Sequence, residues 1–173
     1  MKNFIAIFWI FLAAFGRLIP HPPNFTPLTG LSLFSGSQLP KYISYPSAIL
    51  ALLCSDMLLS RMHGYEIFGM WSLFTYSGFL AVVWSGTKMQ ANAKAPRILG
   101  FTVAASLFYW IWTNFGIWLI SYPKTFAGFV DCYGLALPFL GNSLLGDLIW
   151  TGVIFAGFSL VRRFTKTVET QSA

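Results

Sequence analysis

The run ILGFTVAASLFYWIWTNFGIWLIS (98–121) decides the fold class of this protein. It contains no charged side chain, and about 20 mainly apolar residues are enough for an α-helix to cross the hydrocarbon core of a bilayer. Lipid offers no hydrogen bonds to the backbone, so a segment in lipid must satisfy its own polar groups as a helix does. The run therefore predicts a transmembrane α-helix.

Apolar runs of the same kind predict further helices at 3–18, 43–60, 66–86 and 139–161. The segment PLTGLSLFSGSQLP (27–40) is shorter and rich in Gly and Ser. We expect it to form a short or broken helix inside the bundle, where irregular backbone at membrane depth is tolerated. The prediction is an all-α integral membrane bundle of about six transmembrane helices, with a single domain over 1–163 and a polar cytoplasmic tail over 164–173.

The composition supports a lipid-facing exterior. Of the 173 residues, 56% are hydrophobic and only 9% are charged, whereas a soluble domain has about 25% charged residues. The formal net charge of +6 comes from basic residues that are dispersed between the apolar runs. Dispersed charges form no phosphate track, so we expect the lipid bilayer, and no nucleic acid, as a partner.

The basic residues also predict the orientation, because Lys and Arg near the ends of spans are retained in the cytoplasm. Six crossings with the N-terminus inside place three basic residues outside, namely Arg17, Arg61 and Lys124. The other eight lie inside, namely Lys2, Lys41, Lys88, Lys94, Arg97, Arg162, Arg163 and Lys166. We therefore expect both termini to be cytoplasmic in a multi-pass protein of a bacterial inner membrane.

The sequence contains no motif for catalysis, a metal or a cofactor. Cys54 and Cys132 form no CxxC or Cys/His spacing, and there is no P-loop, dinucleotide loop or Ser/His/Asp order. The expectation is a protein that is not an enzyme and needs neither metal nor cofactor.

Two carboxylates, Asp56 and Asp147, lie inside predicted spans, where an acid is costly unless it is paired or solvated. The predicted orientation puts both in the outer half of the bundle. Arg17 and Lys124 are the candidate partners. Either the two acids contact a ligand, or they form structural ion pairs that tie helices together.

The first outer loop, RLIPHPPNFTP (17–27), contains four prolines that restrict the backbone. A stiff loop could hold His21 and Asn24 over a site, or serve only as a rigid connector. The segment WTNFG (112–116) and the following Lys124 place an amide and a cation among aromatic residues, which suits a small-molecule pocket or plain aromatic packing. The candidate substrate-binding residues are Arg17, His21, Asn24, Asp56, Asn114, Lys124 and Asp147.

These segments resemble an uncharacterised family of small bacterial membrane proteins. The resemblance rests on RLIPHPPNFTP (17–27), CSDMLLS (54–60), TNFGIW (113–118), YPKTFAG (122–128), CYGLALPF (132–139) and GD (146–147), and covers about residues 16–158.

The layout is also similar to the substrate-capture (S) components of energy-coupling-factor transporters. The shared features are an Arg before a proline-bearing first loop, a short Gly-rich second segment and an Asp late in the third helix. The resemblance implies capture of a vitamin-like or micronutrient solute from outside, with a transmembrane coupling subunit and ATPases as partners. One departure is that Ile10, between Ala6 and Ala14, interrupts the row of small residues on which S components dock. Such a departure would be permitted in a solitary relative that acts without a dedicated coupling module.

The function predicted from the sequence is binding and uptake of a small water-soluble nutrient at the outer face. The alternative is a membrane scaffold or assembly factor whose outer polar face binds another protein. A pocket on which the candidate side chains converge would favour uptake, and a filled bundle with those side chains turned outward would favour the scaffold.

Overall fold

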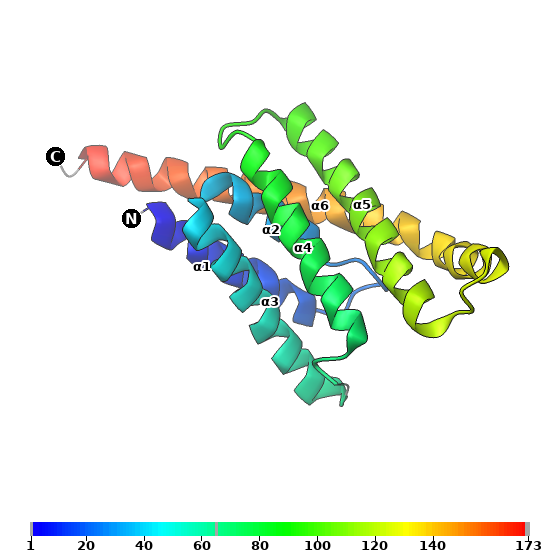
Figure 1. Cartoon of the computed structure of the whole chain (residues 1–173). Helices are drawn as coiled ribbons and strands as arrows, with labels where there is room; N and C mark the ends of the chain where they lie inside the picture. Colours follow the sequence, from blue (N-terminus) through cyan, green and yellow to red (C-terminus); the bar gives the residue numbers. More distant parts are fainter. Residues whose placement is uncertain (1, 65, 172–173) are drawn as a thin grey trace.

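The computed structural model describes residues 2–64 and 66–171, with side chains for 3–64 and 66–164, and the secondary structure there is helical. The elements are α1 (Lys2–Phe15), the 3-10 turn η1 (Gly16–Leu18), α2 (Leu28–Gln38), α3 (Lys41–His63), α4 (Met70–Lys88), α5 (Ala95–Ser121) and α6 (Phe126–Gln171). Successive helices run in alternate directions, so α1 begins on the side of the bundle at which α6 ends, and α6 extends past it (Figure 1). The predicted all-α class is confirmed.

Three stretches are long and apolar enough to cross a membrane within the described residues: α3, α5 and the Phe126–Phe164 part of α6. The first helix is shorter and α2 has only 11 residues. Large apolar side chains are exposed on several helices, as with Phe8 at 61%, Trp84 at 54% and Leu135 at 66%. These features are consistent with a membrane protein, and six helices are present, but length and composition support three spans and not the expected six.

The short helix α2 is the centre of the bundle, since all of its residues are buried. It approaches α4 so closely that a Cβ on Gly86 would lie 2.5 Å from the backbone oxygen of Leu33. A Cβ on Gly36 would likewise collide with the backbone oxygen of Val83. The two glycines therefore let the backbones of α2 and α4 touch, as small residues do between membrane helices. The predicted burial of this segment is confirmed, and its form is a regular short helix.

The middle and the two ends of α2 lie in different surroundings. Phe34, near the middle, packs edge-on against Phe158 of α6 with ring centroids 4.7 Å apart. At the far end, Gln38 Nε2 donates to the carbonyl oxygen of Ala91, 2.9 Å away in the α4–α5 connection. The first residues, Leu28 and Thr29, instead line a cavity described below. Thus α2 extends from that cavity to the opposite end of the bundle.

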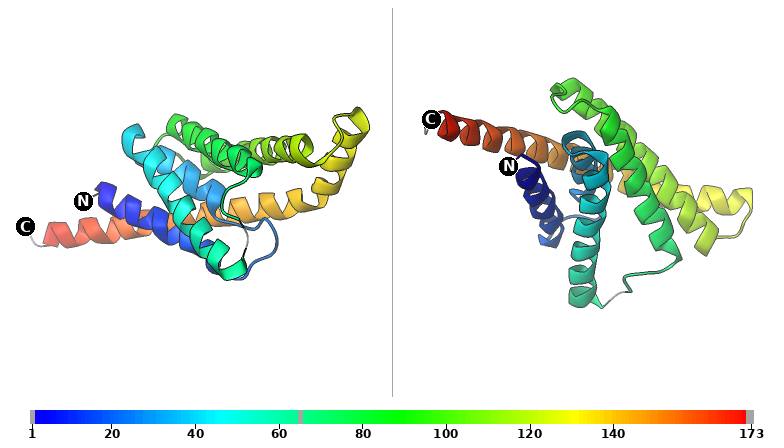
Figure 2. Two further views of the ribbon diagram at one scale, coloured as in Figure 1. Left: turned by 60° about the horizontal axis from the view of Figure 1, so that its bottom comes forward. Right: turned by 60° about the vertical axis from the view of Figure 1, so that its left-hand side comes forward.

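The last helix begins earlier than the sequence predicts. The predicted range was 139–161, whereas α6 begins at Phe126 and contains Pro138 in its interior. A proline removes one backbone hydrogen bond and often bends a helix instead of ending it. The first part of α6, in yellow, lies at an angle to the rest (Figure 2). The helix continues through Gln171 and so includes most of the expected polar tail; residues 172–173 lie outside the described residues.

Candidate functional site

A cavity of about 600 Å³ lies between the loop 19–27 and helices α2 to α6. It is bounded by the parts of these helices nearest the loops 19–27, 64–69 and 122–125, which we call the loop end of the bundle. Its volume is typical of a small-molecule site. The polar and aromatic residues that line it include Arg17, Asn24, Thr26, Thr29, Asp56, Thr75, Tyr76, Phe79, Ser106, Tyr109, Trp110, Thr113, Asn114, Tyr122, Phe139, Ser143 and Asp147.

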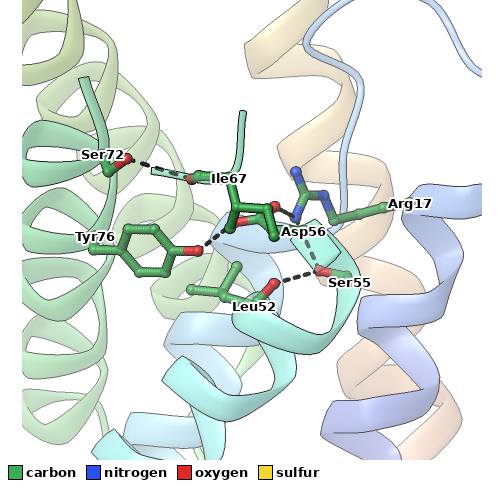
Figure 3. Close-up of polar contacts among 7 residues, drawn as sticks. All are labelled: Arg17, Leu52, Ser55, Asp56, Ile67, Ser72 and Tyr76. Atoms are coloured by element: carbon green, nitrogen blue, oxygen red, sulfur yellow. Dashed lines mark hydrogen bonds and ion pairs between the residues drawn. The ribbon is translucent and has the colours of Figure 1, made fainter. Parts of the chain in front are cut away.

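One side of the cavity is built around Asp56 (Figure 3). Arg17 Nη1 lies 2.5 Å from Asp56 Oδ1 and donates a second hydrogen bond to Ser55 Oγ at 2.9 Å. Tyr76 donates its hydroxyl proton to the other carboxylate oxygen, Oδ2, at 2.5 Å. The cluster joins η1, α3 and α4, so three elements far apart in the sequence are fixed to one another.

The Arg17–Asp56 pair is largely removed from solvent, with side-chain exposures of 15% and 9%. Burying two charges is costly unless they meet each other with good hydrogen bonds. Both oxygens of Asp56 are occupied, whereas Arg17 Nε is buried and has no partner among the residues that the structure describes. Arg17 and Asp56 thus form a buried ion pair that links η1 to α3, which is one of the two arrangements left open by the sequence.

Asp147 lines the cavity from α6 in different surroundings. It is only 6% exposed, and no Lys or Arg forms an ion pair with it among the side chains described. The hydroxyl groups of Thr29 and Ser106 lie near its carboxyl group. Ser106 Oγ is buried and makes no hydrogen bond of standard geometry. Asp147 is thus a buried acid with hydroxyl neighbours and no cation.

Aromatic side chains form one wall of the cavity that the two acids also line. Tyr109 stacks on Phe79 with ring centroids 4.3 Å apart. The same tyrosine lies next to Thr75 and within electrostatic range of Arg17, Asp56 and Asp147. Trp110 Nε1 donates to the carbonyl oxygen of Ala136 at 3.3 Å, which connects α5 to α6. Phe139 of α6 also lines the cavity, so aromatic residues of α4, α5 and α6 all contribute to it.

The loop 19–27 contains a tight turn formed by Pro22, Pro23, Asn24 and Phe25. The amide of Phe25 donates to the carbonyl oxygen of Pro22 at 3.1 Å, and Asn24 has a φ of 62°. Proline in the second position and a residue of positive φ in the third define a type II turn, where Asn is tolerated. His21 Nδ1 lies 2.9 Å from the same carbonyl oxygen. His21 thus supports the turn.

Five of the seven candidate residues line the cavity, namely Arg17, Asn24, Asp56, Asn114 and Asp147. His21 and Lys124 do not. Lys124 is exposed, and its Nζ donates to the carbonyl oxygens of Tyr122 and Trp118 at the end of α5, at 2.7 and 3.3 Å. A lysine near a helix C-terminus is stabilised by these carbonyls and by the helix dipole. Its role is that of a helix cap, and it pairs with neither acid.

Several lining residues were not singled out from the sequence, notably Thr29, Tyr76, Ser106 and Tyr109. A signal existed for Ser106, which is a hydroxyl in the uncharged run of α5. Tyr76 gave no such signal, since it lies in the middle of the predicted span 66–86 and the sequence does not show which way its side chain points. Only the packing of α3 against α4 brings its hydroxyl to Asp56.

The fold and cavity define a helical protein suited to a membrane, with a polar and aromatic pocket between its helices. The chain belongs to DUF6580, a family of unknown function, whose family model matches residues 1–169. The expected membership of an uncharacterised family is confirmed. No curated protein and no solved structure matches the chain.

Proposed function

We propose that this protein is a membrane-embedded binding protein that takes up a small water-soluble solute. The observation that carries the proposal is the convergence of Arg17, Asn24, Asp56, Asn114 and Asp147 on one cavity of about 600 Å³. A scaffold would have no need for a pocket of this size among its helices. Asn114 Nδ2 donates to its own helix at Trp110 O, 2.8 Å away, so its amide oxygen is the part that can accept from a solute.

The proposed orientation has six crossings, both termini in the cytoplasm and the loop end of the bundle outside. It is supported by the eight-to-three distribution of basic residues and by the alternating direction of the helices (Figure 1). The cavity would then face the outside of a bacterial inner membrane, and the turn at Pro22–Phe25 would cover its mouth, since Pro23 and Asn24 are among the lining residues.

The energy for uptake would come from an ion gradient or from a partner, as in the S components that the layout resembles. Ala6, Ile10 and Ala14 are at most 2% exposed and pack in the core of the bundle. This row therefore offers no surface to a coupling subunit. Its burial supports a solitary binding protein over one that docks ATPase-bearing machinery through its first helix.

The proposal is tested by native mass spectrometry of the protein purified in mild detergent, to find a solute that co-purifies with it. Ser143→Trp fills the cavity from α6 and should abolish retention of that solute. Among the described residues, Ser143 Oγ bonds to the carbonyl oxygen of Phe139 in its own helix, at 3.0 Å, so the substitution removes one local hydrogen bond and fills the space.

Ser159→Trp is the matched control, because Ser159 Oγ makes the same bond to Phe155 O at 2.8 Å, on the same helix and outside the cavity lining. The proposal predicts a bound solute in the parent and in Ser159→Trp, and none in Ser143→Trp. Retention of the solute by Ser143→Trp would place it elsewhere. A parent that retains no solute and binds none in a screen would favour the scaffold.

A further inference from the structure

We infer that the cavity selects a small organic cation, held by Asp147 against an aromatic wall. This inference rests on the proposed function and deepens it by naming the class of solute. It depends on the charge balance of the cavity, on the surroundings of Asp147 and on the nature of the neighbouring side chains.

The charge balance leaves one negative charge. The lining contains three Asp or Arg residues, and no Lys, His or Glu. Arg17 and Asp56 neutralise each other at 2.5 Å, and Tyr76 occupies the second oxygen of Asp56. Asp147 is then the uncompensated charge, and a cationic solute is the group that would balance it. An anionic solute would meet the Asp147 carboxylate with no free guanidinium to offset the repulsion.

The burial of Asp147 opposes its charged form, and a cation that binds beside the carboxylate would offset that cost. Thr29 belongs to the first turn of α2, where the helix dipole favours negative charge. Thr29 and Ser106 contribute hydroxyls. A charge inside a membrane protein is retained at a cost, and residues of this kind mark solute and ion pathways. Here the acid faces a cavity, and within the described part of the chain no Lys or Arg side chain forms an ion pair with it.

The other lining residues suit an organic cation better than a bare metal ion. The faces of aromatic rings attract cations, and Tyr76, Tyr109 and Trp110 lie in the same lining. A metal ion would require several carboxylate, imidazole or thiolate ligands, and no group of three or more His, Cys, Asp or Glu side chains gathers at one point among the described residues. The solute predicted is an amine or quaternary ammonium with an apolar or aromatic body.

The test uses three probes with one ring and different charges, namely benzylammonium, benzamide and benzoate. Each is titrated calorimetrically into the full-length protein in nanodiscs of zwitterionic lipid, which do not themselves concentrate cations. Benzylammonium should bind at least about tenfold more tightly than benzamide, as a charge-assisted hydrogen bond would give, and benzoate should bind most weakly.

Asp147→Asn should reduce benzylammonium to the affinity of benzamide, whereas Asp147→Glu should keep the preference. Asp131→Asn is the control, because it makes the same change on the same helix at an exposed position outside the cavity lining. Thermal unfolding of each variant separates loss of binding from loss of fold, and the order of affinities in the parent tests the inference even if Asp147→Asn does not fold.

Equal or tighter binding of benzamide or benzoate would overturn the cation inference while leaving a solute-binding cavity in place. An unchanged preference in a folded Asp147→Asn would overturn it as well. If none of the probes binds, the charge of the co-purified solute decides: a cation whose retention needs Asp147 supports the inference, and a neutral or anionic solute refutes it. If no probe binds and no solute co-purifies, both the proposed function and the cation inference are refuted.

Discussion

Arg17 and Asp56 are 39 residues apart in the sequence and 2.5 Å apart in the structure. Their contact joins the end of the first helical segment to α3, and Tyr76 extends it to α4. Because the charges of Arg17 and Asp56 compensate each other, this side of the cavity carries no net charge. The charge that a solute meets then depends on the remaining polar groups of the site.

Removing one member of this pair should destabilise the bundle. Arg17→Met leaves the Asp56 carboxylate buried with Tyr76 as a donor and should cost about 3–5 kcal/mol in the free energy of unfolding. Denaturant titration in mixed micelles measures the change. The double variant Arg17→Met/Asp56→Leu removes both charges and should recover most of the loss. An Arg17→Met variant as stable as the parent would show that the contact contributes little to the free energy of unfolding.

Gly86→Ala should destabilise the protein, since its new Cβ would lie 2.5 Å from the backbone oxygen of Leu33 and 3.0 Å from the Leu33 Cα. Overpacking at a backbone contact costs about 1–3 kcal/mol. Gly100→Ala is the control: that glycine is also in a helix, but apart from the adjacent residues and the nearby backbone of its own helix no described atom lies within 4 Å of its Cβ position, so the change should be neutral or stabilising. Equal thermal stability of the two variants would argue against close contact between α2 and α4.

Asn24→Gly should leave the first loop intact, because Gly adopts the positive φ of 62° without strain. Asn24→Val places a β-branched side chain in that conformation and should cost about 1–3 kcal/mol. Hydrogen exchange at the amide of Phe25, which closes the turn, should accelerate in the Val variant alone. Similar exchange in both variants would mean that the turn does not constrain the loop.

The proposed orientation predicts that reporter fusions after Gly64 and after Lys124 are external and that a fusion after Asn92 is internal. The physical reason is the retention of the basic residues of 88–97 and 162–166 on the cytoplasmic side. Paired phosphatase and fluorescent reporters read the two sides independently. An internal reading at Gly64 would reverse the side to which the cavity opens.

The sequence predicted most of the helices because uncharged apolar runs are strong signals, and α5 ends at Ser121 as expected. It failed at 126–138, where Asp131 and Pro138 resemble a connection although the helix continues through both. It also identified Asp56 and Asp147 as acids inside predicted spans and named Arg17 and Lys124 as candidate partners, without showing which pairs form. Whether Arg17 or Lys124 reaches an acid depends on how each helix is rotated in the bundle, which a single sequence does not specify.

The short length of α2 has a consequence for the permeability barrier. Its 11 residues span about 16 Å, whereas the hydrocarbon core of a bilayer is roughly 30 Å thick. In the proposed orientation, a solute resting against Leu28 and Thr29 would already stand about midway across the membrane. The remaining barrier is then the thickness of one short helix, fastened at its far end by Gln38 to Ala91. Under the proposed uptake function, passage would require α2 to move relative to α4 and α6, against which it packs.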